Sequence, residues 1–558
     1  MNRYGILTCA FLLSNILHAG AQQWRSKLYP ESPKKVEANF YSDQMIQDFS
    51  FAGYHKGDKE IPSGFSTILD VTTAPYHADS SGKQDVTLIL QKAIDDAASV
   101  KGGAVVFLPQ GTYKVSPQKG KKYCLLISHS NTILRGAGQA RSRIFNVSAG
   151  MRGRAILLVS SGSSWRTEGW ALQRIAKDLM APSTSIPVGS AKDYKPGDLI
   201  IIRNYINDDW VADHRMLPYW KGRGGNLGGL LYFRKVISAD NKKNILTIDI
   251  PTRYALKTAQ NSCVYKAPPV LSEVGIEDLS FGNVQSFQEG DWSEESFTKR
   301  ENPSYESHDS WAVAIEGVYN GWIRKVASCC PTGNLSGAHL LSNGIKLSQT
   351  ANVSILECDF RKPQFGGGGG NGYMYRIMGN ENLIKDCRAE AMRHGFVLSG
   401  MNASGNVFFR CIDKDTGRQT GLSGHEKTSG SGSDHHMHFS HSNLFDQCTV
   451  ENSFFAAGWR RWGGATIHGL TAAHSVYWNL VSNGTQEYGV QTQQGRYGYV
   501  IGTSGDKPGV RTTAWLEGTE EITEPLDYTE GIGAGATLIP QSLYLDQQEK
   551  RKQREAKD

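Results

Sequence analysis

A short pattern of alternating apolar and polar residues recurs along the second half of the chain. Each copy is bounded by Gly, Asn or Ser, and the clearest copies are VSILECDF (353–360), NLIKDCRAE (382–390), NVFFRCIDK (406–414), NLFDQCTVE (443–451) and SVYWNLVSN (475–483). Such alternation predicts short β-strands, and repeats about 20–50 residues apart are typical of solenoid proteins. We therefore expect an all-β chain folded as a parallel β-helix, with loops of unequal length at its turns.

Cysteines occupy one place in successive copies of this pattern. They are Cys358, Cys387, Cys411 and Cys448, and Asn479 takes this place in the fifth copy. Residues at one place in stacked coils lie about 4.8 Å apart, so we expect these side chains to form an inward ladder. Cysteine packs well as a small apolar residue, which favours free buried thiols over disulfide bonds. The sequence has no Cys-x-x-Cys pair, so the cysteines do not indicate a zinc site.

The N-terminal part carries a different pattern. Residues 85–98 (DVTLILQKAIDDAA) have apolar side chains at helical spacing, with Asp85 placed as a cap. GGAVVFLPQGTYKV (102–115) and ILRGAG (133–138) follow, and VGIEDLSF (274–281) opens the main run of coils. In these motifs the chain resembles the pectate-lyase-like superfamily of right-handed parallel β-helices, which also includes polygalacturonase-type hydrolases. The resemblance implies a right-handed solenoid with an N-terminal capping helix, on a scaffold that supports lyases, hydrolases and sugar-binding tailspikes alike.

The chain divides into six segments. We expect a signal peptide (1–21), an N-terminal extension (22–64), a capping helix with the first coils (65–149), an inserted small β-rich domain (150–268), the main β-helix (269–540) and a charged C-terminal tail (541–558). Arg3, the apolar run 6–16 and the small residues 19–21 are typical of a cleavable export signal. The apolar run is shorter than the roughly 18 residues that a membrane span requires. These features predict a secreted or periplasmic protein without membrane insertion.

Charge and composition narrow the possible partners. The formal net charge of +6 is small for 558 residues, and no long Lys/Arg block indicates nucleic-acid binding. The many Gly, Tyr and Trp residues are typical of a turn-rich β protein that can pack aromatic rings against sugars. A solenoid with polar, capped ends needs no partner subunit, so we expect a monomer.

Histidines and arginines gather in the later coils, where they could form one site. If the coils align, His394, His438 and His468 come from three successive coils and stack on one face, flanked by arginines. The candidate catalytic residues are His394, His436, His438, Arg461, His468 and Tyr477. The candidate substrate-binding residues are Arg393, His435, Arg460, Trp459 and Trp462.

This combination of residue types is suited to β-elimination of a uronate in an anionic polysaccharide. The reaction needs a base for the proton beside the carboxylate, a cation for the resulting dianion, and an acid for the leaving oxygen. His438 or His468 is the expected base, with the other as acid or orienting group, and Tyr477 is a further candidate acid. Arg461 or Arg460 is the expected carboxylate ligand, because guanidinium groups bind carboxylates with two hydrogen bonds.

Other functions use different residues. A glycoside hydrolase on this scaffold would need a pair of carboxylates, and the candidates are Asp413, Asp415, Glu426, Asp434 and Asp446. A glycan-binding protein without catalysis would need neither set. No dense acidic cluster indicates a calcium site, so we expect no cofactor, although Ca²⁺ is used by many lyases of this fold. His435, His436 and His438 offer only a weak transition-metal pattern.

Overall fold

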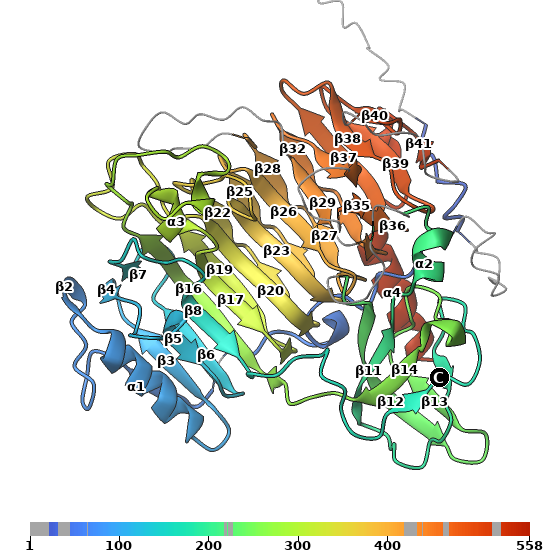
Figure 1. Cartoon of the computed structure of the whole chain (residues 1–558), viewed down its shortest axis with the longest axis horizontal. Helices are drawn as coiled ribbons and strands as arrows, with labels where there is room; N and C mark the ends of the chain where they lie inside the picture. The colour runs from blue at the N-terminus through green and yellow to red at the C-terminus, as the bar shows by residue number, and fades with distance from the viewer. Residues whose placement is uncertain are drawn as a thin grey trace, which may run out of the picture.

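The computed structural model describes residues 22–31, 45–63, 65–216, 220, 227–417, 432–437, 439–460, 468–515 and 526–557. Two long sheets of parallel strands form the body of the molecule (Figure 1). Strands of the first sheet include β16 (Val274–Asn283), β19 (Trp322–Ser328), β21 (Ser354–Leu356), β24 (Leu383–Lys385), β27 (Val407–Phe409), β31 (Leu444–Asp446), β37 (Val476–Asn483) and β39 (Tyr499–Ser504). The same sheet includes β22 (Asp359–Arg361), β25 (Arg388–Glu390), β28 (Ile412–Lys414) and β32 (Thr449–Glu451).

The second sheet holds the strands on which the candidate site lies. Its order is β5 (Tyr123–Ile127), β8 (Ala155–Ser160), β17 (Trp311–Glu316), β20 (Asn343–Ala351), β23 (Tyr373–Asn380), β26 (His394–Ser399), β29 (Ser433–Met437), β33 (Phe455–Ala457), β38 (Tyr488–Thr492) and β40 (Gly509–Arg511). Neighbouring strands in this series are parallel, and each comes from the next coil. Parallel strands joined by crossovers coil in the right-handed sense. The predicted right-handed parallel β-helix is therefore confirmed.

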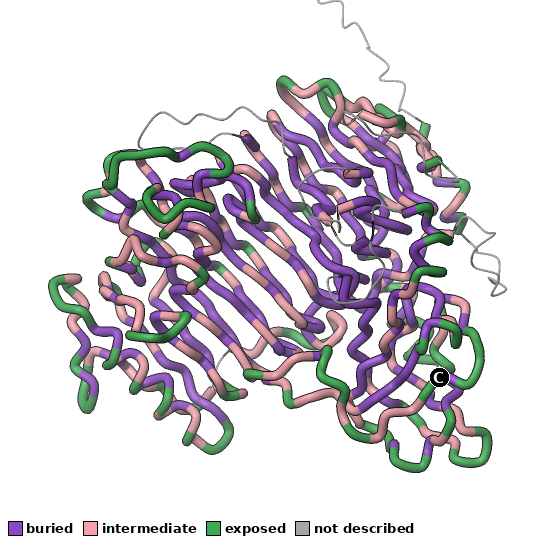
Figure 2. The backbone as a smooth tube through the Cα atoms, in the orientation of Figure 1, coloured by how far each residue is buried: buried purple, intermediate pink, exposed green. Residues whose placement is uncertain are grey.

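Buried residues run along the strands, and exposed residues concentrate in the loops at the turns (Figure 2). The predicted cysteine ladder is confirmed: Cys358, Cys387, Cys411 and Cys448 are buried and free. Strand register continues this ladder with Leu480, because Thr449 pairs with Val481. The place predicted for Asn479 was thus wrong by one residue.

Asn479 instead occupies a sharp corner that recurs in every coil. It has a φ of +51°, and the residues preceding each rung of the ladder share this left-handed conformation, with φ between +51° and +57°: Asp278, Lys325, Glu357, Asp386, Arg410 and Gln447. Side chains other than Gly adopt it at a cost of roughly 1–2 kcal/mol. The amides of four of these corner residues donate to the next coil, as from Asp386 to Phe409 O at 3.0 Å and from Arg410 to Asp446 O at 2.9 Å. Stacking of the coils therefore stabilises a corner that local sequence does not favour.

The helix α1 (Thr87–Ala98) covers the first coils, as the sequence predicts. Its face of Leu90, Ala93, Ile94 and Ala97 is buried, and the Asp85 carboxylate accepts the Thr87 amide at 2.9 Å at its start. At the other end of the chain, α4 (Leu543–Glu555) is a packed helix rather than a free tail. Its Arg551 is paired with Asp58 at 2.6 Å. None of the helices in the described residues is long and apolar enough to cross a membrane.

A separate antiparallel sheet lies beside the coils (Figure 1). Its order is β10 (Ser185–Pro187), β13 (Ile245–Ile248), β12 (Leu230–Asp240), β11 (Leu199–Asn204), β14 (Cys263–Lys266) and β9 (Gln173–Arg174). Trp210 and Trp220, from the same inserted part, share an apolar core with Phe439 and Leu470 of the coils. The inserted sheet is thus packed against the coils through a common core.

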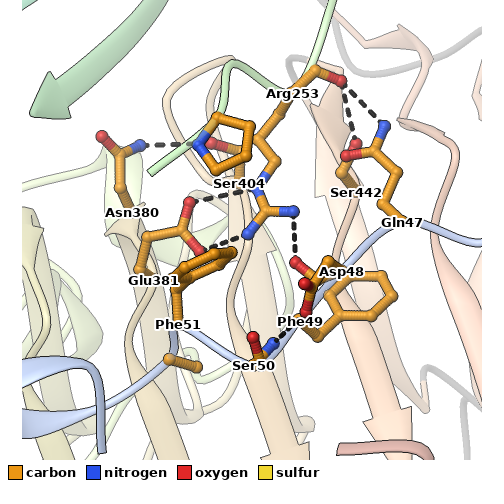
Figure 3. Close-up of polar contacts among 12 residues, drawn as sticks. Gln47, Asp48, Phe49, Ser50, Phe51, Arg253, Asn380, Glu381, Ser404 and Ser442 are labelled. Carbon is orange, nitrogen blue, oxygen red and sulfur yellow. Dashed lines mark hydrogen bonds and ion pairs between the residues drawn. The ribbon is translucent and has the colours of Figure 1, made fainter. Parts of the chain in front are cut away.

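A buried ion cluster joins this sheet, the N-terminal segment and the coils (Figure 3). Glu381, in the turn after β23, accepts from Arg234 of β12 at 3.1 Å and from Arg253 at 2.7 Å, and all three side chains are at most 1% exposed. Arg253 also donates to Asp48 O at 2.6 Å, while its own carbonyl accepts from Gln47 at 3.0 Å. One carboxylate therefore balances two buried guanidinium groups from another part of the chain.

Replacing Glu381 by Gln should destabilise the protein by about 3–5 kcal/mol, because it leaves two buried cations without their counter-ion. Denaturant unfolding measures the change. Asp386→Asn is the matched control, since it removes the exposed pair with Arg410 (2.7 Å), and it should cost less than about 1 kcal/mol. Equal effects of the two variants would contradict this account.

Three buried histidines lie where the inserted sheet meets the coils. The hydroxyl of Tyr254 is 2.6 Å from His214 Nε2, the hydroxyl of Tyr232 is 2.8 Å from His441 Nε2, and the His474 ring lies 5.5 Å from that of Tyr254. Burial lowers the pKa of His214 and of His441 to about 3, and that of His474 well below its ordinary value. These side chains are therefore neutral in the folded protein at neutral pH.

Acid should weaken the folded state through these histidines. At a pH between the ordinary histidine pKa of about 6.5 and the folded value near 3, the unfolded chain binds a proton that the folded chain does not. The free energy of unfolding therefore decreases as the pH is lowered, by up to about 1.4 kcal/mol per pH unit for each such histidine. The variant His441→Gln lacks one of these histidines, so it should lose less stability than wild type when the pH is lowered. The stability difference between wild type and His441→Gln should therefore shrink between pH 7 and about pH 4.5. Unfolding curves at both pH values measure it, and a constant difference would contradict the expectation.

Candidate functional site

Four polar residues on three neighbouring strands of the second sheet form the candidate site. These are Tyr373 of β23, His394 of β26, and Asp434 and His436 of β29; we call them the Tyr–His–Asp cluster. Tyr373 and His394 are direct partners across β23 and β26, and Asp434 pairs with Val397 one strand further on. Stacked strands lie about 4.8 Å apart, which brings residues distant in the sequence into contact.

An irregularity in β29 accompanies the placement of His436. The register between β26 and β29 shifts after Leu398, which pairs with His435, because Ser399 pairs with Met437. An extra residue of this kind re-aims nearby side chains. His435 points into the coil, where its Nδ1 lies 2.7 Å from Ser440 Oγ and its ring 5.8 Å from that of Phe445. His436 instead belongs to the cluster.

Hydrogen bonds set the roles of the ring nitrogens. Asp434 Oδ2 lies 3.1 Å from His436 Nδ1, and the Tyr373 hydroxyl lies 3.0 Å from His436 Nε2. A carboxylate only accepts, so Nδ1–H donates to Asp434 and the Tyr373 hydroxyl donates to Nε2. His394 Nδ1 lies 2.8 Å from Gly432 O and donates to it. This leaves a lone pair on His394 Nε2, which is buried without a hydrogen-bond partner among the described residues.

Burial determines the charge state of the cluster. It lowers the pKa of His394 and of His436 well below the ordinary histidine value, and for His436 the nearby Arg460 and Arg393 add to the effect. Burial raises the pKa of Tyr373, although Arg393 and Arg376 oppose the shift. At neutral pH the two imidazoles are therefore neutral and the phenol is protonated. The cluster can offer both a base and an acid.

Arginines surround the cluster in two different ways. Arg460 forms a close ion pair with Asp434. Arg376 and Arg393 instead lie with their guanidinium carbons 5.8 and 5.9 Å from the centre of the Tyr373 ring. Among the described residues, Arg376 Nε and Arg393 Nη1 are buried without a hydrogen-bond partner. Arg393 also forms an ion pair with Glu294 at 3.6 Å. Both side chains keep a donor that can meet an anion beside Tyr373, whereas Arg460 is engaged by Asp434 within the cluster.

The glycine-rich turn before β23 allows this close approach. Gly372 has a φ of +72°, and a Cβ at this position would lie 2.9 Å from the Cβ of Arg393. Any side chain there would push Arg393 away from Tyr373. Gly372 therefore contributes to the site through its lack of a side chain.

The structure brings together several of the residues that the sequence indicated. His394, His436, Arg393 and Arg460 lie in or beside the cluster, and the His468 ring lies 5.9 Å from that of His436. His438, Arg461 and Trp462 lie outside the described residues. The expected stack of His394, His438 and His468 stays a prediction, because His438 lies outside the described residues; the ring of His436 lies 5.1 Å from that of His394.

Three predicted site residues lie elsewhere. Tyr477 is in the coil interior, stacked 5.2 Å from Phe445, because alternation along β37 turns it inward. His435 is interior for the same reason. Trp459 packs in the apolar core shared with the inserted sheet, where other core side chains surround its ring. These three predictions of contact with substrate were wrong.

Tyr373, Asp434 in its orienting role, and Arg376 were missed. The missing signal is strand register: Tyr373 is the partner of His394, and Arg376 is the partner of Val397, which in turn pairs with Asp434. Tyr373 lies in the coil before the conspicuous histidines, and no local motif marks it. An alignment of the coils on their second-sheet strands would have indicated it.

The candidate hydrolytic carboxylates are occupied by structural contacts. Asp413 lies inside the coil, bonded to the hydroxyls of Thr416 and Ser433, and burial raises its pKa to about 6. Asp446 accepts from Ser542 at 2.7 Å and from the Tyr544 amide at 2.8 Å at the start of α4. Asp415 accepts from Asn452 at 2.8 Å. Glu426 lies outside the described residues.

The cluster does not suit calcium. His394, Asp434 and His436 could offer ligand atoms to one metal ion, since these atoms lie within 4.8 Å of one another. Ca²⁺ requires six to eight oxygen ligands, whereas this set has one carboxylate, already paired with Arg460. The weak metal pattern of His435, His436 and His438 gains no support, because His435 faces the coil interior and His438 lies outside the described residues.

Residues 71–187 match the family model "Rhamnogalacturonase A/epimerase, pectate lyase-like". This match confirms the resemblance to the pectate-lyase-like superfamily of right-handed parallel β-helices, over the first coils and the start of the inserted part. The Tyr–His–Asp cluster lies outside the matched range. No curated protein sequence matches the chain.

Several solved structures are similar in fold. The tailspike gp49 of Pseudomonas phage LKA1 is 15% identical, with 75% of this chain and 56% of that chain covered and a TM-score of 0.45. The tailspike gp61 of Pseudomonas phage phi297 is 13% identical, with 80% and 71% covered and a TM-score of 0.45. The A-module of the mannuronan C-5 epimerase AlgE4 of Azotobacter vinelandii is 13% identical, with 79% and 95% covered and a TM-score of 0.27. The chain spans little more than half of the LKA1 tailspike chain, and at these identities the likeness concerns the fold alone.

Proposed function

We propose that this protein acts on a uronate-containing anionic polysaccharide and cleaves it by β-elimination. The observation that carries the proposal is the chain of hydrogen bonds from Asp434 through His436 to the Tyr373 hydroxyl, beside the available Nε2 of His394. The family model over residues 71–187, which names pectate-lyase-like enzymes, supports a polysaccharide as the substrate class. The export pattern of residues 1–21 supports action outside the cytoplasm.

In the proposed reaction His394 is the base. Its Nε2 lone pair removes the proton at C5, next to the uronate carboxylate, and its Nδ1–H remains held by Gly432 O. Burial lowers the pKa of His394, which keeps this lone pair free at neutral pH. We assign this role to His394 rather than His468 because its ring lies 5.0 Å from that of Tyr373, the proposed acid, and His438 lies outside the described residues.

Arg376 and Arg393 stabilise the carbanion in this scheme. Removal of the C5 proton places a second negative charge on the carboxylate group, and preorganised cations in a buried site lower the free energy of that dianion. Both guanidinium groups flank Tyr373, and within the described residues each keeps one buried donor without a hydrogen-bond partner, although Arg393 also pairs with Glu294 at 3.6 Å. Arg460 has a different role, since its ion pair with Asp434 keeps that carboxylate oriented toward His436.

Tyr373 is the acid. Its hydroxyl protonates the glycosidic oxygen at C4 as the C4–O bond breaks and the C4=C5 double bond forms. The cycle closes when His394 releases the C5 proton to water and a proton from water reaches the phenolate through Nε2 of His436, whose transient imidazolium Asp434 stabilises. Base and acid lie close together, with the Tyr373 and His394 ring centres 5.0 Å apart. This arrangement supports removal of the proton and departure of the leaving group on one face of the sugar.

Hydrolysis is the less favoured alternative. It needs two carboxylates about 5–9.5 Å apart across the scissile bond. Asp434 is tied to Arg460 and His436, and Asp413 is enclosed in the coil interior. A catalytic pair of this kind is therefore not supported by the contacts of Asp413, Asp415, Asp434 and Asp446.

The reaction class can be tested with a panel of uronate polysaccharides. Elimination creates a 4,5-unsaturated sugar that absorbs ultraviolet light, whereas hydrolysis creates only a new reducing end. We expect the absorbance to rise, and to rise equally with a chelator present, because His394, Arg376 and Arg393 supply the base and the cations. New reducing ends without absorbance would indicate a hydrolase, and binding without either product would indicate a glycan-binding protein. Either result would overturn the proposal.

Two tyrosine-to-phenylalanine variants compare the catalytic contribution of a hydroxyl in the candidate site with that of a hydroxyl in the coil interior. Tyr373→Phe removes the acid and should lower kcat by about 10²–10⁴-fold, in line with the usual contribution of a positioned proton donor. Tyr477→Phe is the matched control; its hydroxyl lies in the coil interior, so kcat should stay within about twofold. Steady-state kinetics and melting temperatures measure both. A Tyr373→Phe enzyme of normal activity would exclude this hydroxyl as the acid.

A further inference from the structure

We propose that the Tyr–His–Asp cluster is also a binding site for a transition-metal dication such as Zn²⁺, and that the bound metal inhibits the protein. Its ligands are His394, Asp434 and His436, whose ligand atoms lie within 4.8 Å of one another. Metal binding by this set is independent of the reaction class. The inhibition rests on the proposed function, because it requires His394 to be the base.

The donor set matches zinc in number and type. Two imidazoles and one carboxylate with an open fourth position are a frequent zinc arrangement, in which ligand atoms lie about 3.3 Å apart around the metal. Here His436 Nδ1 lies 3.1 Å and His394 Nδ1 3.6 Å from the Asp434 carboxylate, and the three ligand atoms lie within 4.8 Å of one another. Nitrogen donors favour Zn²⁺ and neighbouring transition metals over Ca²⁺ and Mg²⁺, which prefer oxygen.

Unsatisfied atoms of the cluster point to a ligand. Within the described residues, His394 Nε2 and Asp434 Oδ1 are buried without a hydrogen-bond partner. Buried polar atoms without partners are uncommon, and such atoms often mark a binding site. The hydrogen bond from His394 Nδ1 to Gly432 O holds the ring in the way that metal-binding histidines are usually held.

Arg460 opposes the metal. Its ion pair with Asp434 must loosen when a dication binds, and the charges of Arg376 and Arg393 lie nearby. The protein should thus need no resident metal for its own reaction, yet bind added Zn²⁺ through the two neutral imidazoles. This competition gives a directional expectation: removing the Arg460 charge should strengthen metal binding.

Once bound, the metal would stop the proposed reaction in two ways. Coordination of His394 removes its function as the base through either nitrogen: at Nε2 the metal occupies the lone pair, and at Nδ1, which faces Asp434 at 3.6 Å, it shifts the imidazole proton to Nε2. Coordination of His436 or Asp434 breaks the chain of hydrogen bonds that returns a proton to Tyr373. Zinc inhibition should therefore lower kcat rather than raise KM alone, because the affected groups act on protons rather than on substrate binding.

Calorimetric titration of the chelator-treated full-length protein with ZnCl₂ tests the binding. We expect one equivalent to bind to the wild type. His394→Ala should weaken binding at least about tenfold, which is the usual effect of losing a metal contact. Arg460→Gln should strengthen it at least about threefold, because it removes a nearby positive charge. His129→Ala, at an exposed histidine far from the cluster in sequence, is the matched control and should leave binding unchanged. Melting temperatures without metal verify that the variants are folded.

Each possible result of these titrations either supports the proposed metal site or overturns part of the proposal. No stoichiometric binding, or binding unaffected by His394→Ala, would overturn the site. Weaker binding in Arg460→Gln would overturn the competition with Asp434. Titration with CaCl₂ should give no comparable heat, and equal affinity for Ca²⁺ would contradict the nitrogen-ligand set. If zinc binds as expected but the protein shows no elimination activity, the metal site stands and the proposed function fails.

Discussion

Hydrogen bonds between successive parallel strands are the constraint on which the rest of this structure depends. They set the coils about 4.8 Å apart and hold equivalent residues in register. The cysteine ladder, the left-handed corners such as Asp386 and Arg410, and the pairing of Tyr373 with His394 all follow from that register. A residue therefore acquires its neighbours from the adjacent coil, about 20–40 positions away in the sequence.

Some buried ionisable groups of this protein stay charged, and others are held in their neutral forms. Glu381 keeps a charge in the interior because Arg234 and Arg253 balance it. Burial instead favours the neutral forms of four histidines, because nearby carboxylates do not offset the cost of burying their charge. These are His214, His441, His394 and His436. The ion cluster attaches the inserted sheet to the coils, and the neutral imidazoles give the candidate site its base. Exclusion of water thus accompanies both the buried ion pairs of Glu381 and the neutral imidazoles of the candidate site.

The arginines near the cluster show why proximity alone does not assign a role. Arg460 lies beside the histidines, yet its ion pair with Asp434 engages it in orienting that carboxylate. Arg376 and Arg393 lie against Tyr373 and have donors without protein partners. Arg393 also pairs with Glu294 at 3.6 Å, so the two arginines differ from Arg460 in keeping an unused donor rather than in lacking a counter-ion. The ion pair of Arg460 with Asp434 also explains why a dication would bind in the cluster only in competition with Arg460.

The sequence by itself determined the repeating strands, the inward cysteines and the capping helix, because these depend on local alternation, helical spacing and turn residues that recur within each copy. It also located His394, His436, Arg393 and Arg460, since clustered histidines and arginines are conspicuous in any strand. Only the tertiary structure decided that Tyr477 and Trp459 are core residues, that Leu480 rather than Asn479 continues the ladder, and that Tyr373 completes the cluster. The physical reason is that a one-residue shift at a corner or an irregular strand turns a side chain to the other face, and its position is set by packing between coils rather than by the local residues.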